Sequence, residues 1–203
     1  MITQMYQEAD LSLKNDSKSP DENSEDAVYD SNDINGIGRA GFKDVYTVHD
    51  ADRQVVFDVI NDVSKYPQFL KIYATTQVLS DEVDPHDKSK RIRIGRYNIA
   101  IPFLLKAFFR DLHYTLKLTS HYDEKTRTES MWWEQIEGPS FLVDNSGRWD
   151  VREDGKDIKI FLQMNLGYSF YLPEYIKKYI MNQILKDSMH NIHKRVLEVL
   201  GRV

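Results

Sequence analysis

Hydrophobic and polar positions alternate along most of the chain from residue 42 onward, and this spacing predicts a protein rich in β-strands. In the segment 158–170 every second residue, from Ile158 to Phe170, is apolar. In the segment 91–101 the apolar positions change phase around Gly95, so a β-bulge is predicted there. Strands are expected at 42–49, 75–83, 91–101, 112–118, 127–136, 141–151 and 158–170.

A helical spacing of apolar residues occurs at two places. Residues 56–63 repeat at i, i+3, i+4 and i+7, which predicts an amphipathic helix after the first strand, with Asp50 as its N-cap. Pro67 interrupts this pattern and predicts a second short helix or turn. An apolar stripe over 173–200 predicts a final helix on the order of 40 Å long, at ~1.5 Å per residue. Gly201 is expected to end it.

This order of elements predicts an α+β fold. A first strand is followed by two short helices, about six further antiparallel strands and one long C-terminal helix. A curved antiparallel sheet around a single long helix buries the apolar face of each element against the other. The many aromatic residues suit a sheet of about seven strands that leaves a cavity between itself and that helix.

Charge is unevenly distributed along the chain. Residues 1–40 contain three basic and nine acidic residues, a net charge of 3 − 9 = −6, whereas the whole chain carries −5 and the remainder therefore +1. This stretch is also rich in Ser, Asn and Gly, with little apolar periodicity. Such a segment buries too little surface to offset its ordering entropy. We therefore expect an acidic, disordered tail at 1–40 and a ligand-binding domain at 41–203.

Composition excludes several kinds of chemistry. The chain has no cysteine, which removes disulfides, thiolate metal sites and cysteine nucleophiles and fits a reducing compartment. No apolar run approaches the roughly 18 residues that span a bilayer. Residues 1–8 lack the basic and apolar parts of a signal peptide. We expect a cytoplasmic protein. Peripheral contact with the inner face of a membrane is an additional hypothesis.

Short motifs in the domain resemble the START-like (SRPBCC, helix-grip) superfamily. They are 51–63 with Tyr66-Pro67-Gln68-Phe69-Leu70, then Ile136-Glu137-Gly138-Pro139, then Gly147-Arg148-Trp149, then the final helix. Their order and spacing over 42–200 are most similar to the coenzyme Q-binding and polyketide cyclase/dehydrase-like branch, which also includes the RatA-type toxins. Family members often carry a tryptophan soon after the Tyr-Pro motif, whereas this chain has Lys71-Ile72-Tyr73.

The resemblance implies an apolar cavity between the sheet and the C-terminal helix, which family members use for quinones, lipids, sterols or polyketides. Such sites are mostly apolar, with a few placed polar groups. A plain core role is the alternative for every candidate. The residues expected to line the cavity are Phe69, Tyr97, Phe103, Leu105, Phe109, Tyr114, Trp133, Phe141, Trp149, Tyr168, Phe170, Ile180 and Ile184.

The connection at 101–109 is almost wholly apolar where a polar turn is expected. One hypothesis is that it forms the cavity mouth or enters a membrane interface transiently, with Lys106 and Arg110 near headgroups. The alternative is that the flanking strands extend further and this run belongs to the core.

Catalysis has thinner support. Acid–base chemistry in such a pocket has candidates in Arg96, His113, His121, Glu134 and Arg148, but His113 falls on the polar side of its strand. The sequence has no Ser–His–Asp order, glycine-rich phosphate loop or paired-carboxylate signature. We therefore assign no catalytic residue and lean towards a protein that is not an enzyme.

A metal site and a resident cofactor are not expected either. His190 and His193 share a helix face, but no third ligand is evident, so solvated helix histidines are the expectation. The bound molecule is expected to be a quinone or lipid acting as ligand.

The leading hypothesis is non-catalytic binding, chaperoning or transfer of a hydrophobic small molecule, a quinone or other isoprenoid lipid. The alternative is a RatA-type ribosome- or protein-interaction module, and the third is a polyketide cyclase/aromatase-like enzyme. Contact with ribosomal RNA requires a basic face. A domain near +1 with an acidic tail argues against it, and no DNA partner is expected.

Overall fold

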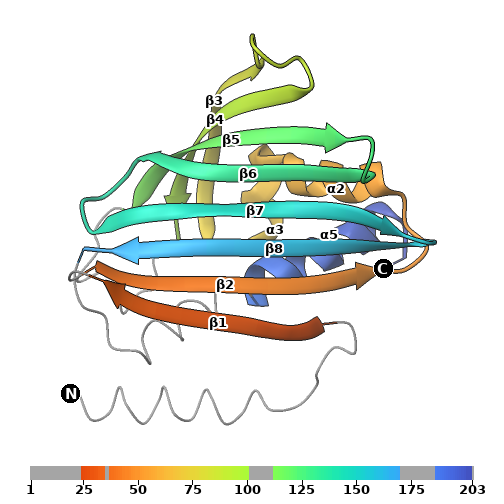
Figure 1. The fold of residues 1–203 in the computed structure, drawn as a ribbon, viewed down its shortest axis with the longest axis horizontal. Coiled ribbons are helices and arrows are strands. Elements are labelled where there is room, and N and C mark those ends of the chain that lie inside the picture. The colour runs from red at the N-terminus through yellow and green to blue at the C-terminus, as the bar shows by residue number, and fades with distance from the viewer. Residues whose placement is uncertain (1–23, 35–36, 101–111, 170–185, 203) are drawn as a thin grey trace.

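The computed structural model describes residues 24–34, 37–100, 112–169 and 186–202. In these ranges eight antiparallel strands form one sheet, in the order β1-β2-β8-β7-β6-β5-β4-β3 (Figure 1). Strands β2 and β8, which are far apart in the chain, are therefore neighbours. The strands are β1 (Ser24–Ile34), β2 (Ile37–Val48), β3 (Tyr73–Val83), β4 (Lys90–Ile99), β5 (His113–Asp123), β6 (Thr128–Glu137), β7 (Leu142–Asp154) and β8 (Asp157–Tyr168).

The helices lie together on one face of this sheet (Figure 1). Helix α2 contacts β6 and β7, whereas α3, only a few residues later, contacts the edge strand β3. The sheet is curved, as expected, and these two short helices lie against different strands of the same face. Among the described residues no helix is long and apolar enough to cross a membrane. The helical elements are α2 (Arg53–Asn61), a 3₁₀ turn (Val63–Lys65), α3 (Tyr66–Phe69), a π turn (Lys186–His190) and α5 (Asn191–Val199).

The sheet begins earlier than the sequence predicted. Strand β1 lies inside the segment 1–40 that we expected to be disordered, and it pairs with β2 from Ser24 to Ile34. Residues 24–34 therefore belong to the sheet, whereas the tail stays a prediction for residues 1–23, which lie outside the described residues. The composition argument failed because an edge strand is held by main-chain hydrogen bonds, which do not require apolar side chains.

Helix α2 has the predicted apolar face but a different N-cap. Val56, Val59 and Ile60 are all buried. The cap is Asp52, whose carboxylate accepts hydrogen bonds from the backbone N–H groups of Gln54 (2.8 Å) and Val55 (3.2 Å). The predicted cap, Asp50, instead sits in the preceding turn with a φ of +46°, outside the extended conformation of a cap residue.

The predicted β-bulge at Gly95 lies in the neighbouring strand. Strand β4 pairs with β5 without interruption, whereas its register with β3 shifts between Val78 and Ser80, opposite Gly95 and Ile94. The apolar residues of β4 therefore change phase because they lie on different faces of the sheet, and not because this strand contains an extra residue. Tyr97 is fully buried on the inner face, while Ile94 is only half-buried.

The C-terminal helix ends as predicted. Gly201 has a φ of +68°, and its N–H donates to the carbonyl of Glu198 while that of Arg202 donates to Leu197. This pair of bonds is the Schellman motif, in which glycine avoids the strain of a left-handed residue. The predicted start at Pro173 lies outside the described residues, so the helix length stays a prediction.

Candidate functional site

The inner face of the sheet, on the side of the helices, is strongly aromatic. Five predicted cavity residues are buried on it, and the strand register places several opposite one another, as with Tyr97 and Tyr114 or Leu118 and Trp133. The two remaining described candidates, Phe69 and Phe141, are half-buried against the same core. The five buried residues are Tyr97, Tyr114, Trp133, Trp149 and Tyr168.

Four tyrosine rings form a continuous file across the inner face. Tyr66 of α3 stacks on Tyr73 with centroids 5.7 Å apart, Tyr73 lies 5.5 Å from Tyr97, and Tyr97 stacks on Tyr114 at 5.6 Å. Phe69 meets Tyr66 edge-on at 5.8 Å. These separations are within the range of favourable aromatic pairs. The file links the short helix α3 to the centre of the sheet.

This apolar interior contains hydrogen-bonding groups, most of which satisfy one another. The Tyr66 hydroxyl donates to the carbonyl of Ile60 at 2.5 Å. Tyr73 and Tyr114 lie close enough for each to influence the pKa of the other, and the side chain of Asn145 influences that of Tyr114. Trp133 donates from Nε1 to Asn145 Oδ1 at 3.1 Å.

Burial keeps these phenols neutral. It raises the pKa of Tyr66, Tyr73, Tyr97 and Tyr114 above the usual value, in each case as the largest cause. The Tyr97 hydroxyl differs from the others because it has no hydrogen-bond partner among the described residues.

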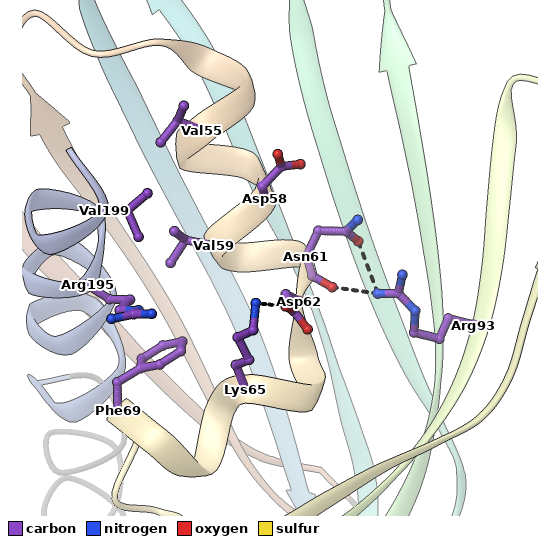
Figure 2. Close-up of a pocket in the computed structure, with 10 residues that line it drawn as sticks. All are labelled: Val55, Asp58, Val59, Asn61, Asp62, Lys65, Phe69, Arg93, Arg195 and Val199. Atoms are coloured by element: carbon purple, nitrogen blue, oxygen red, sulfur yellow. Dashed lines mark hydrogen bonds and ion pairs between the residues drawn. The ribbon is translucent and has the colours of Figure 1, made fainter.

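A groove of about 490 Å³ lies beside this aromatic file, between α2, α3 and α5 (Figure 2). Val55, Val59, Phe69 and Val199 give it an apolar lining, and Figure 2 shows Arg93 reaching it from β4. Phe69 belongs both to the groove and to the aromatic contact with Tyr66, so the two features are continuous. Polar residues complete the lining, namely Asp58, Asn61, Asp62, Lys65 and Arg195.

The cations of the groove are each engaged. Lys65 pairs with Asp62 at 2.8 Å, and Arg195 pairs with Glu198 at 2.9 Å. Arg93 donates from Nε and Nη2 to Asp81 at 3.1 and 3.0 Å. Its Nη1 donates to the carbonyl of Asn61 at 2.5 Å, which ties the end of α2 to the sheet. Partial burial is the largest single effect on the pKa of Asp62 and of Asp81, and it raises both. The ion pairs outweigh it, so that both pKa values are lower than usual.

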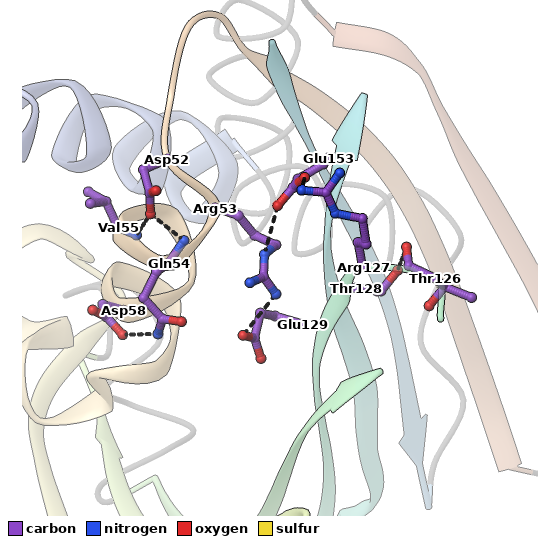
Figure 3. Close-up of polar contacts among 10 residues, drawn as sticks. All are labelled: Asp52, Arg53, Gln54, Val55, Asp58, Thr126, Arg127, Thr128, Glu129 and Glu153. Carbon is purple, nitrogen blue, oxygen red and sulfur yellow. Dashed lines mark hydrogen bonds and ion pairs between the residues drawn. The ribbon is translucent and has the colours of Figure 1, made fainter. Parts of the chain in front are cut away.

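The other end of α2 is held by Arg53 (Figure 3). Its side chain is only 16% exposed, and its guanidinium lies 4.1 Å from the centre of the Tyr122 ring. It pairs with Glu129 at 3.0 Å and with Glu153 at 3.3 Å, residues of β6 and β7 respectively. Burial raises the pKa of Glu129, and Arg53 offsets only part of that rise. The groove wall formed by α2 is therefore fixed to the sheet at both ends.

Sequence reasoning missed part of this site and named residues that the structure does not describe. Tyr66, Tyr73 and Asn145 were not predicted, although the first lies in the Tyr-Pro motif and could have been included on that basis. Asn145 gave no signal, because its role depends on the pairing of β6 with β7. Whether any candidate touches a ligand stays a prediction. Outside the described residues lie Phe103, Leu105, Phe109, Phe170, Ile180, Ile184 and the segment 101–109.

The residues considered for acid–base chemistry do not meet inside the sheet. Four of the five candidates are each next to an inward-facing aromatic residue on the same strand. Because successive side chains of a strand point to opposite faces, these four lie on the outer face. Glu134 accordingly pairs with Lys117 at 2.9 Å on the outer surface. His121 Nδ1 lies 3.2 Å from the carbonyl of Ser89 at the β4–β5 end of the sheet. The four are Arg96, His113, Glu134 and Arg148, beside Tyr97, Tyr114, Trp133 and Trp149.

No protein-family model and no curated protein matches this sequence. Solved structures do match. The STAR-related lipid transfer protein from Xanthomonas axonopodis (12% identity) has a TM-score of 0.57 over 83% of this chain and 98% of its own. The Zhui aromatase/cyclase from Streptomyces sp. R1128 (12% identity) has a TM-score of 0.56 over 80% and 96%. The human StAR-related lipid transfer protein 5 (11% identity) has a TM-score of 0.58 over 98% and 97%.

The chain has the START-like helix-grip fold. At these identities the likeness concerns the fold, and it agrees with the class that the sequence motifs indicated. The names of the similar proteins describe lipid transfer in two cases and an aromatase/cyclase in the third. Because one START-like scaffold carries both functions, the residues of this chain must decide between them.

Proposed function

We propose that this protein binds a hydrophobic small molecule without transforming it, and that the ligand is a quinone or another isoprenoid lipid. The observation that supports this most is the aromatic inner face, which contains buried hydrogen-bonding groups and continues through Phe69 into a groove of about 490 Å³. The groove has a volume within the roughly 300–1,000 Å³ of ligand sites in proteins. Six of its ten lining residues are polar, so the apolar walls typical of such sites come mainly from the aromatic inner face.

Binding rather than catalysis is supported by where the ionisable residues lie. General acid–base catalysis needs a titratable group within hydrogen-bond reach of the reacting atoms. Four of the five candidates lie on the outer face, and the buried tyrosines have pKa values raised by burial, which makes them poor proton acceptors. A cytoplasmic location, transient membrane contact through 101–109 and a ribosomal partner remain predictions from the sequence.

Native mass spectrometry of protein purified from cells tests the proposal directly. We expect an added mass that is extracted by organic solvent and matches a quinone or isoprenoid lipid. In parallel, titration of delipidated protein with decylubiquinone should quench tryptophan fluorescence saturably, because Trp133 and Trp149 are buried on the inner face. Absence of both a co-purified molecule and saturable quenching contradicts the proposal.

A pair of matched variants locates the binding. Val55→Phe adds bulk to the groove, whereas Val143→Phe makes the same change at a position whose side chain is 48% exposed on another element. We expect the first variant to weaken decylubiquinone binding at least fivefold and the second to leave it unchanged. Equal affinities in the two variants argue against a path through the groove.

A further inference from the structure

The Tyr97 hydroxyl is an exception in this interior. Tyr97 is 1% exposed, and its oxygen lacks a hydrogen-bond partner among the described residues. By contrast, the neighbouring Tyr66 of the file donates its hydroxyl to the carbonyl of Ile60. Leaving a buried hydroxyl unpaired destabilises the folded state. A phenylalanine would fill the same space without that cost, so the hydroxyl requires an explanation.

The backbone of β4 orients this hydroxyl. Arg93, Gly95 and Tyr97 occupy successive inner-face positions on the strand. A Cβ atom at residue 95 would lie 3.0 Å from Tyr97 Cε2 and 3.1 Å from the hydroxyl oxygen. The ring therefore lies back over Gly95, with its hydroxyl towards Arg93. Arg93 lines the groove and Tyr97 does not, so the unpaired hydroxyl lies behind the groove wall, on the side of Arg93.

The charges around the groove limit what can occupy it. Arg93, Lys65 and Arg195 are all paired with carboxylates, so an anionic headgroup would have to break an existing ion pair. Asp58 adds a further negative charge to the lining. A phosphate is therefore disfavoured, whereas a neutral oxygen can be accommodated. It would meet a phenol that burial keeps protonated and able to donate.

We propose that Tyr97 is a specificity-determining residue whose hydroxyl donates a hydrogen bond to a neutral carbonyl or hydroxyl oxygen at the polar end of the ligand. This inference rests on the proposed function and narrows it. The ligand is a neutral, oxygen-bearing hydrophobic molecule, distinct from a pure hydrocarbon and from a phospholipid. Because the hydroxyl is enclosed, a ligand oxygen that reaches it past the Arg93 side of the groove wall faces little competition from solvent for this bond.

Two probes of the same shape separate the hydrogen bond from hydrophobic burial. Menadione and 2-methylnaphthalene share one carbon skeleton and differ in two carbonyl oxygens. Menadione is usable because the chain has no cysteine thiol with which it could react. Binding of each probe to the full chain is measured by equilibrium dialysis. We expect Tyr97→Phe to weaken menadione binding about two- to tenfold, the effect of one hydrogen bond, and to leave 2-methylnaphthalene binding unchanged.

Tyr66→Phe is the matched control, because it removes a hydroxyl that already has a partner, the carbonyl of Ile60. It should lower the melting temperature without changing the ratio of the two affinities, whereas Tyr97→Phe should leave the melting temperature equal or higher. If Tyr97→Phe does not alter that ratio, the specificity role is overturned while hydrophobic binding stands. If neither probe binds to the wild-type protein, the proposed function and the specificity role are both overturned.

Discussion

Gly147 gives the sharpest test of the packing on the inner face. It is paired across the sheet with Trp133, and the indole ring lies over it. A methyl group at this position would overlap Trp133 Cζ2 and would lie 2.5 Å from the carbonyl oxygen of Gln163. Both separations are far below the ~3.5 Å of ordinary contact. Gly147→Ala must therefore displace a buried ring, a strand backbone, or both.

The size of the effect follows from these contacts. Overpacking in a well-packed core costs about 1–3 kcal/mol. Displacing Trp133 also breaks its hydrogen bond to Asn145, worth about 0.5–1.5 kcal/mol. We therefore expect Gly147→Ala to lower the free energy of unfolding by about 2–4 kcal/mol. For a chain of this length the corresponding fall in melting temperature is between about 4 and 16 °C.

Urea denaturation followed by tryptophan fluorescence measures this change. The control is Gly155→Asn, at a turn with a φ of +67° and no atom within 4 Å of an added Cβ. Asparagine tolerates this conformation, so the control should cost less than about 1 kcal/mol. In a Trp133→Phe background the alanine at 147 should cost less, because phenylalanine lacks the two closest ring atoms. A Gly147→Ala protein within 1 kcal/mol of wild type would show that the ring does not rest on this glycine.

Two further predictions concern buried charges. Arg53→Met should destabilise the protein by about 2–3 kcal/mol, because it leaves the buried Glu129 unpaired, and the double variant with Glu129→Gln should recover most of the loss in urea denaturation. A double variant as unstable as the single one contradicts the pairing. Burial raises the pKa of Asp44, so its ionised form destabilises the fold and stability falls as pH rises through that pKa. Asp44→Asn should thus be more stable than the wild type at pH 7, by less than about 1 kcal/mol because the group is half-exposed. This advantage should disappear near pH 4. Equal gains at both pH values would contradict the raised pKa.

The repeating elements of the fold could be predicted because each leaves a periodic pattern. Strand β8 and the buried face of α2 follow directly from apolar residues at intervals of two and of three to four. Strand β1 left no such pattern, because it is a polar edge held by pairing with β2. The phase change that predicted a bulge is visible in β4, whereas the extra residue belongs to β3. Features that depend on a partner strand cannot be read from one strand alone.

The site was predictable in composition and less so in arrangement. Tyr97, Tyr114 and Trp133 could be identified from the sequence, because they are large aromatic residues at inward positions of their strands. Their hydrogen bonds were not predictable, because Asn145 reaches Trp133 only through the register of β6 against β7. The groove was missed for the same reason, since it is formed by residues of α2, α3, α5 and β4 that are far apart in the chain.

The polar groups of the inner face therefore say more about function than the apolar ones do. A filled core and a ligand site both require large apolar residues, so Trp133 and Trp149 are compatible with either. A core selected for stability alone has no use for a buried hydroxyl that lacks a partner. Tyr97 carries one, unpaired among the described residues, beside a groove whose cations are already paired. The stability and the probe selectivity of Tyr97→Phe therefore distinguish the two. If the hydroxyl contacts a ligand, its removal lowers the affinity for an oxygen-bearing probe without loss of stability. If the hydroxyl is structural, its removal lowers stability alone.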